Sequence, residues 1–139
     1  MTLERTTLQA IANAKLQDAE LLFQNERYSN AYYLFGYAAE IAIKSRISRL
    51  FQSDTIPDKK FVQDIHSHDL NRLIGLAGLS ADLTESRIAS PVFDGHWSAV
   101  SDWNEASRYD IIDVFEATAM RNAMVDEVQG IFRWLQERW

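Results

Sequence analysis

The sequence contains no cysteine, only two prolines and five glycines among 139 residues, and no apolar run long enough to cross a membrane. The absence of cysteine excludes disulfide bridges, thiolate zinc sites, iron–sulfur clusters and a cysteine nucleophile. Neither a glycine-rich phosphate loop nor an HExxH motif occurs. The opening residues 1–5 lack the apolar core of a signal peptide, and we therefore expect a soluble cytoplasmic protein with no membrane partner.

The composition is that of one folded domain, which we expect to cover residues 1–139. Hydrophobic residues make up 47% of the chain, and a second domain would leave each half with a marginal core. The formal net charge is −6, but six basic residues lie in 44–72 against four acidic ones, whereas 82–127 holds ten acidic residues against three basic ones. An anionic partner would therefore meet the 44–72 region, although random clustering on a solvated surface explains the same counts.

The periodicity is helical throughout. Pro57 and Pro91 fall between helical segments, and no stretch alternates apolar and polar residues as a half-buried strand does. The sequence predicts an all-α fold, an antiparallel up-and-down bundle of four to five main helices. Ser29 and Asp113 are expected N-caps, and Gly78 is an expected helix end. The expected segments are 7–24, 31–43, 69–77, 80–89, 94–103 and a last helix that continues from 113 to the C-terminus.

The second segment is the most informative. From Ala31 to Ile43 every residue except Glu40 is apolar, aromatic or glycine. A helix that is apolar on all sides is buried on all sides, so we expect it at the centre of the bundle. Gly36 costs about 1 kcal/mol relative to alanine in a helix interior, and close approach by another helix would explain its presence.

Glu40 is a lone carboxylate on this apolar helix, and a buried carboxylate must be paired or have a raised pKa. Lys44 lies one turn later and can pair with it. The spacing places Tyr33, Tyr37, Glu40 and Lys44 in one stripe. This stripe is either a polar groove lined by phenols and an ion pair or, as we favour, a core network that fixes helix packing.

Residues 64–69 form the richest polar cluster, Asp-Ile-His-Ser-His-Asp. Their spacing fits no familiar metal-ligand pattern, so we expect no metal and no other cofactor. Instead of a metal site, we expect a helix start in this cluster. Ser67 or His68 begins the helix, and Asp69 lies in its first turn, where negative charge is favourable.

Arg108 and Tyr109 lie in the loop before the last helix. The guanidinium of Arg108 could bind a phosphate or a carboxylate with two parallel hydrogen bonds. It could equally pair with Glu40 or Asp69 and tie the loop to the bundle.

An ordered set of short motifs carries a family resemblance. An amphipathic first helix leads into Arg-Tyr-Ser-Asn-Ala at 27–31 and Tyr-Ala-Ala-Glu-Ile-Ala-Ile-Lys at 37–44, followed by His-Asp-Leu at 68–70 and Arg-Tyr at 108–109. In this order, over residues 8–138, the chain resembles the HEPN domains, small helical bundles often found beside nucleotidyltransferases and in toxin–antitoxin or defence systems. The resemblance implies ligand-binding positions at Tyr37, Glu40, Lys44, His68, Asp69, Arg108 and Tyr109.

The ribonuclease members of that family resemble one another in an arginine followed four to six residues later by a histidine, usually acting across a dimer. No arginine stands at that spacing before His66, His68 or His96. The resemblance therefore implies a non-catalytic module, a homodimer that binds a partner protein such as an antitoxin or a nucleotidyltransferase, or a nucleotide or RNA.

Two alternatives stay open. One is a metal-independent ribonuclease toxin with a substituted site, with His66 or His68 as general base and Lys60 or Arg72 holding phosphate. The other is a purely structural bundle that recruits another subunit. The tryptophans are more typical of a core or an interface than of base-stacking platforms, and an exposed aromatic patch on the terminal helix would favour the homodimer; the four are Trp97, Trp103, Trp134 and Trp139.

Overall fold

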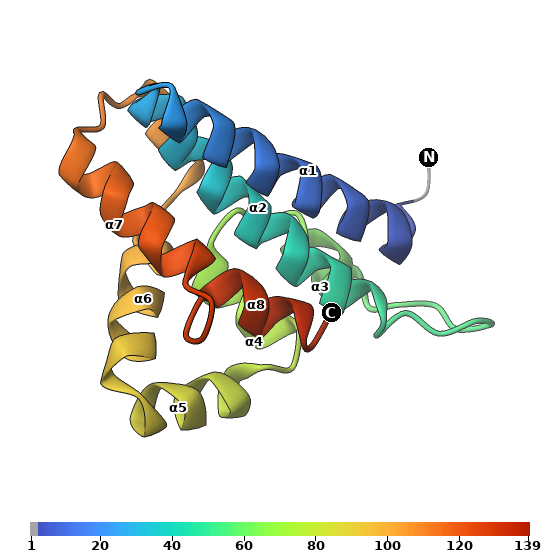
Figure 1. Cartoon of the computed structure of the whole chain (residues 1–139). Helices are drawn as coiled ribbons and strands as arrows, with labels where there is room; N and C mark the ends of the chain where they lie inside the picture. Colours follow the sequence, from blue (N-terminus) through green and yellow to red (C-terminus); the bar gives the residue numbers. More distant parts are fainter. Residues whose placement is uncertain (1–2) are drawn as a thin grey trace.

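The first two helices form a long antiparallel pair (Figure 1). The computed structural model describes residues 3–139, in which α1 spans Arg5–Gln24 and α2 spans Tyr28–Ser48. A turn at residues 25–27 joins them, so the chain reverses direction as the short link predicts. α1 packs Leu8, Ala12 and Ala19 against the bundle through its buried face.

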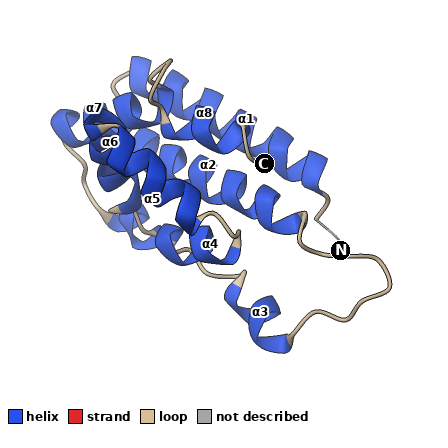
Figure 2. Ribbon diagram, turned by 90° about the horizontal axis from the view of Figure 1, so that it is seen from below, coloured by secondary structure: helices blue, strands red, loops and turns tan. Residues whose placement is uncertain are grey.

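Shorter helices follow, and residues 3–139 contain no strand (Figure 2). The all-α prediction is therefore confirmed. The up-and-down arrangement is clear for α1 and α2, whereas for the shorter helices it stays a prediction. The later elements are α3 (Lys59–Asp64), α4 (Leu70–Leu76), α5 (Ser80–Ala89), α6 (Pro91–Ser101), the 3-10 helix η1 (Glu105–Tyr109), α7 (Val114–Val125) and α8 (Ile131–Gln136).

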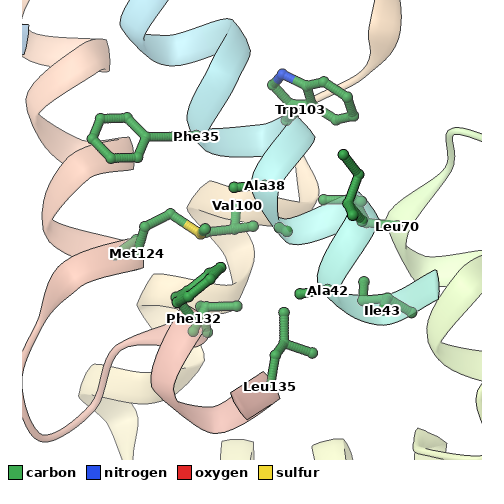
Figure 3. Packing of buried hydrophobic residues seen from close by; sticks show 14 of the residues in the cluster. Phe35, Ala38, Ala42, Ile43, Leu70, Val100, Trp103, Met124, Phe132 and Leu135 are labelled. Atoms are coloured by element: carbon green, nitrogen blue, oxygen red, sulfur yellow. The ribbon is translucent and has the colours of Figure 1, made fainter. Parts of the chain in front are cut away.

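α2 is the central helix, as its composition predicts. It contacts α1, α4, α7, α8 and η1, and these partners enclose it on several sides. Ala38 and Ala42 are fully buried among the side chains of the surrounding helices (Figure 3). Small residues at these positions let the neighbouring helices approach closely, which large side chains would prevent.

Most helix boundaries follow local chemistry. Asp113 accepts the backbone N–H of Glu116 at 2.8 Å, and Gly78 ends the preceding helix with φ +72°, as predicted. The predicted cap at Ser29 is wrong: α2 already begins at Tyr28, and the Ser29 hydroxyl instead accepts the N–H of Ile112 at 2.9 Å. The helix α3 was not predicted from the sequence.

The single terminal helix predicted from residue 113 to the C-terminus is also wrong, because the chain breaks between α7 and α8. The Asp126 carboxylate accepts the backbone N–H groups of Val128 and Gln129, which turns the chain out of helical geometry. At Gly130 a side chain would overlap the Asp126 carbonyl oxygen. Val128, predicted on the buried face, is consequently 76% exposed.

Gly36 is approached closely, as predicted, but by a side chain rather than by a helix. The indole of Trp103, just beyond the end of α6, lies directly against it. Trp97 and Trp134 are also buried, and the Trp134 indole donates a hydrogen bond to Ser86 Oγ at 3.0 Å. The aromatic patch considered for the terminal helix is therefore largely inside the molecule, and it no longer argues for a homodimer.

Across residues 3–139, no helix is both long enough and apolar enough to cross a membrane.

Candidate functional site

The site is centred on Glu40, whose side chain is only 2% exposed on the central helix. Its two carboxylate oxygens have separate partners. Oε2 pairs with Lys44 Nζ at 3.3 Å, as the spacing predicts, and Oε1 lies 2.8 Å from His68 Nδ1. Both oxygens therefore have a polar partner, which a buried carboxylate requires.

His68 lies between two carboxylates. Its Nδ1 faces Glu40, and its Nε2 faces Glu105 Oε2 at 3.0 Å. Glu105 in turn accepts from Arg108 at 3.2 Å. The result is a continuous polar chain from α2 through the start of α4 to η1, which we call the Glu40–Arg108 network; its members are Lys44, Glu40, His68, Glu105 and Arg108.

Two predicted pairings are corrected by this geometry. Arg108 does not reach Glu40 or Asp69; within η1 it pairs with Glu105, one turn earlier. Asp69 stands outside the network, because its carboxylate caps α4 by accepting the N–H of Arg72 at 3.2 Å. It therefore precedes the helix rather than lying in its first turn.

Tyr109 is brought to the edge of the network without entering it. Its ring lies under the Arg108 guanidinium at 4.8 Å, and its side chain is 77% exposed. Of the predicted site residues, the structure thus joins four directly and leaves three beside them. The direct members are Glu40, Lys44, His68 and Arg108, and the neighbours are Tyr37, Asp69 and Tyr109.

Sequence reasoning missed Glu105, which completes the network. Its position in the loop before the last helix gave no reason to distinguish it from nearby surface acids. The available signal was its spacing three residues before Arg108, which places the two side chains on one side of a helical turn.

An aromatic cluster forms one side of the site. The rings of Tyr33, Tyr37 and Trp103 lie 5.8–6.3 Å apart in pairs around the face of α2 that carries Gly36. Burial, reinforced by the charge of Glu40, raises the pKa of the Tyr37 phenol. Tyr37 therefore keeps its proton at neutral pH and acts as a neutral wall of the site.

Both ring nitrogens of His68 have a partner within the protein. Nδ1 lies 2.8 Å from Glu40 and Nε2 lies 3.0 Å from Glu105. A general base needs a ring nitrogen within hydrogen-bond reach of a substrate proton, and both nitrogens are already occupied. In this geometry His68 links two carboxylates.

The basic residues of the 44–72 region are held in place within the protein but are not all neutralised. Lys60 and Arg72 share one carboxylate, that of Asp64, in solvent-exposed contacts. Arg46 and Arg49 each donate to the Arg138 carbonyl oxygen, which positions the guanidinium groups without cancelling their charge. The region therefore keeps a positive charge.

A shallow hollow of about 370 Å³ opens beside the network. His68 and Trp103 line it on one side, and Asp69 and Asp102 contribute carboxylates. The hollow contains no lysine or arginine. Its lining therefore does not match the requirements of a phosphate group, which binds where cations or helix N-termini converge.

Among residues 3–139, no three His, Asp or Glu side chains are arranged to hold a metal ion. No protein-family model, no curated protein and no solved structure matches this chain.

Proposed function

We propose that this chain is a non-catalytic, HEPN-like interaction module that binds a partner protein, in a toxin–antitoxin or defence context. The observation that carries the proposal is the enclosure of His68. With Glu40 on one nitrogen and Glu105 on the other, the best-placed titratable side chain is committed to a structural link.

The network supports binding in an indirect way. It joins α2 to η1 through His68, and so it fixes the segment that leads into α7. That segment presents several apolar side chains to solvent. An ordered, exposed apolar surface is typical of a protein-binding site. The hollow beside the network has no lysine or arginine in its lining, which favours a protein partner over a nucleotide or RNA.

The competing hypothesis is a metal-independent ribonuclease that uses His66 or His68. His66 is exposed, but Lys60 and Arg72, the proposed phosphate-binding residues, are held by Asp64. Single-stranded RNA incubated with the purified protein in the presence of a chelator tests the choice. We expect no cleavage. Cleavage that disappears in both His66→Ala and His68→Ala variants, or in either one alone, would refute the non-catalytic proposal.

The homodimer implied by the family resemblance stays part of the proposal. A measurement of mass in solution at micromolar concentration tests it separately, and a monomer would contradict it. That result would leave binding to a different partner protein intact.

A further inference from the structure

Four large apolar side chains are exposed within seven residues at the entry to α7. The segment is well defined, because Ile112 at its centre is 7% exposed and its N–H donates to Ser29 Oγ on α2. The buried Ile112 anchors the segment and turns its neighbours outward. The exposed side chains are Tyr109 (77%), Ile111 (97%), Val114 (39%) and Phe115 (80%).

Two carboxylates accompany this apolar segment. Asp110 lies within it and Glu116 directly follows it, and both act, with Asp102, on the buried Tyr32. Burial, reinforced by these three charges, raises the pKa of Tyr32 to about 12. Within residues 3–139 none of the three carboxylates forms an ion pair, and the Tyr32 side chain, 5% exposed, forms no hydrogen bond.

We propose that this apolar–acidic surface, made by Ile111 and Phe115 with Asp110 and Glu116, binds a cationic amphipathic segment of a partner protein. The inference rests on the proposed function and names the chemistry of the partner. Exposed apolar side chains supply the area that a partner buries, and unpaired carboxylates beside them complement lysine or arginine at its edge.

The charge pattern also argues against a second copy of this chain on the same surface. A two-fold interface places one patch against itself. The carboxylates of one copy would then lie against the acidic surface of the other, and like charges held together at an interface are unfavourable. The homodimer of the proposed function would need a different face.

A synthetic helical peptide of leucine and lysine, labelled with a fluorophore, is the probe. Its binding is followed by fluorescence anisotropy at moderate ionic strength, beside a leucine and glutamate peptide with the same apolar pattern. We expect the lysine peptide to bind and the glutamate peptide to fail. Added salt should weaken binding, because the charged contacts are exposed to solvent.

Matched variants locate the binding surface. Ile111→Ser with Phe115→Ser removes the apolar part, and we expect the affinity for the lysine peptide to fall about tenfold or more. The control is Ile88→Ser with Val92→Ser, which removes two exposed apolar side chains elsewhere, Ile88 (80%) in α5 and Val92 (54%) in α6, and should leave the affinity unchanged.

A second pair of variants tests the charges. Asp110→Asn with Glu116→Gln should weaken binding severalfold and reduce its salt dependence. Glu85→Gln with Glu127→Gln removes the same charge elsewhere on the surface and should have little effect. Circular dichroism of every variant shows whether it is folded before its affinity is compared.

Three results would overturn this inference. In the first, the control variants weaken binding as much as the surface variants. In the second, both peptides bind with equal affinity. In the third, the wild-type chain self-associates and the Ile111→Ser, Phe115→Ser variant is monomeric, which would assign the surface to a second copy. All three are compatible with the proposed interaction module. RNA cleavage that is lost on substitution of His68 would instead refute the module, while peptide binding stays unchanged.

Discussion

Replacing Gly36 by alanine should destabilise the protein, against the ordinary preference of helices for alanine. A methyl group at this position would lie less than 3.0 Å from three atoms of the Trp103 indole. Trp103 is 2% exposed and packs beside Tyr33 and Tyr37, so its ring has little room to retreat. The substitution must therefore displace a large buried side chain or push α2 away from it.

Two opposing effects determine how much Gly36→Ala changes the free energy of unfolding. Alanine gains about 1 kcal/mol over glycine in a helix interior. Overpacking costs about 1–3 kcal/mol, and expulsion of the indole would approach the roughly 3–5 kcal/mol of deleting a buried tryptophan. The steric cost therefore exceeds the helical gain, and we expect a net loss of about 1–3 kcal/mol in the free energy of unfolding.

Urea unfolding followed by circular dichroism measures this loss. Gly95→Ala is the matched control, because Gly95 lies inside α6 and a methyl group there meets nothing within 4 Å. The free energy of unfolding of the Gly95→Ala control should rise by up to about 1 kcal/mol. In a Trp103→Ala background, Gly36→Ala should become neutral or stabilising. A Gly36→Ala variant as stable as the wild type would refute the steric argument.

Four further substitutions test three individual contacts, all by urea unfolding. Glu40→Leu should change the free energy of unfolding by less than about 1 kcal/mol. Lys44→Ala should lower it by about 1–3 kcal/mol, because it leaves the buried Glu40 carboxylate short of one partner. Equal effects of the two substitutions would contradict this order. Asp126→Asn should cost about 1 kcal/mol at neutral pH. The backbone N–H of Gln129, foremost among several contacts, lowers the pKa of Asp126 from 3.8 to about 2. The wild type should therefore be more stable than the Asp126→Asn variant by the full amount above pH 3.8, and this difference should fade as the pH falls through about 2. If the difference in the free energy of unfolding does not change with pH, the Asp126 carboxylate is not its source. Arg121→Lys keeps the charge but loses the bidentate hydrogen bond to Glu20. We expect the free energy of unfolding to fall by about 0.5–1 kcal/mol, and added salt should reduce this loss. An unchanged stability would show that the bidentate bond is dispensable.

The sequence predicted the central helix well because its evidence was local. Residues 31–43 are apolar on every face, and only the middle of a bundle satisfies such a helix. The Glu40–Lys44 pair followed from spacing of one turn. The ends of helices with a distinctive residue, such as Asp113 and Gly78, were predictable for the same reason.

What the sequence did not predict depends on contacts between distant segments. His68 reaches Glu40 across 28 positions, and nothing in the local sequence of either residue specifies the other. The break before α8 was hidden because apolar spacing continues through it, although Asp126 and Gly130 carry the local signal of a turn.

The Glu40–Arg108 network also bears on the order of folding. α1 and α2 are neighbours in the chain, so their contacts close short loops. The bridge from Glu40 through His68 to Glu105 needs three distant segments in place at once. We therefore expect the bridge to form after the main kinetic barrier, so that His68→Ala accelerates unfolding and leaves the refolding rate almost unchanged. Stopped-flow chevron plots would show this as a shift of the unfolding arm alone, and the bridge would then control how long the native state persists.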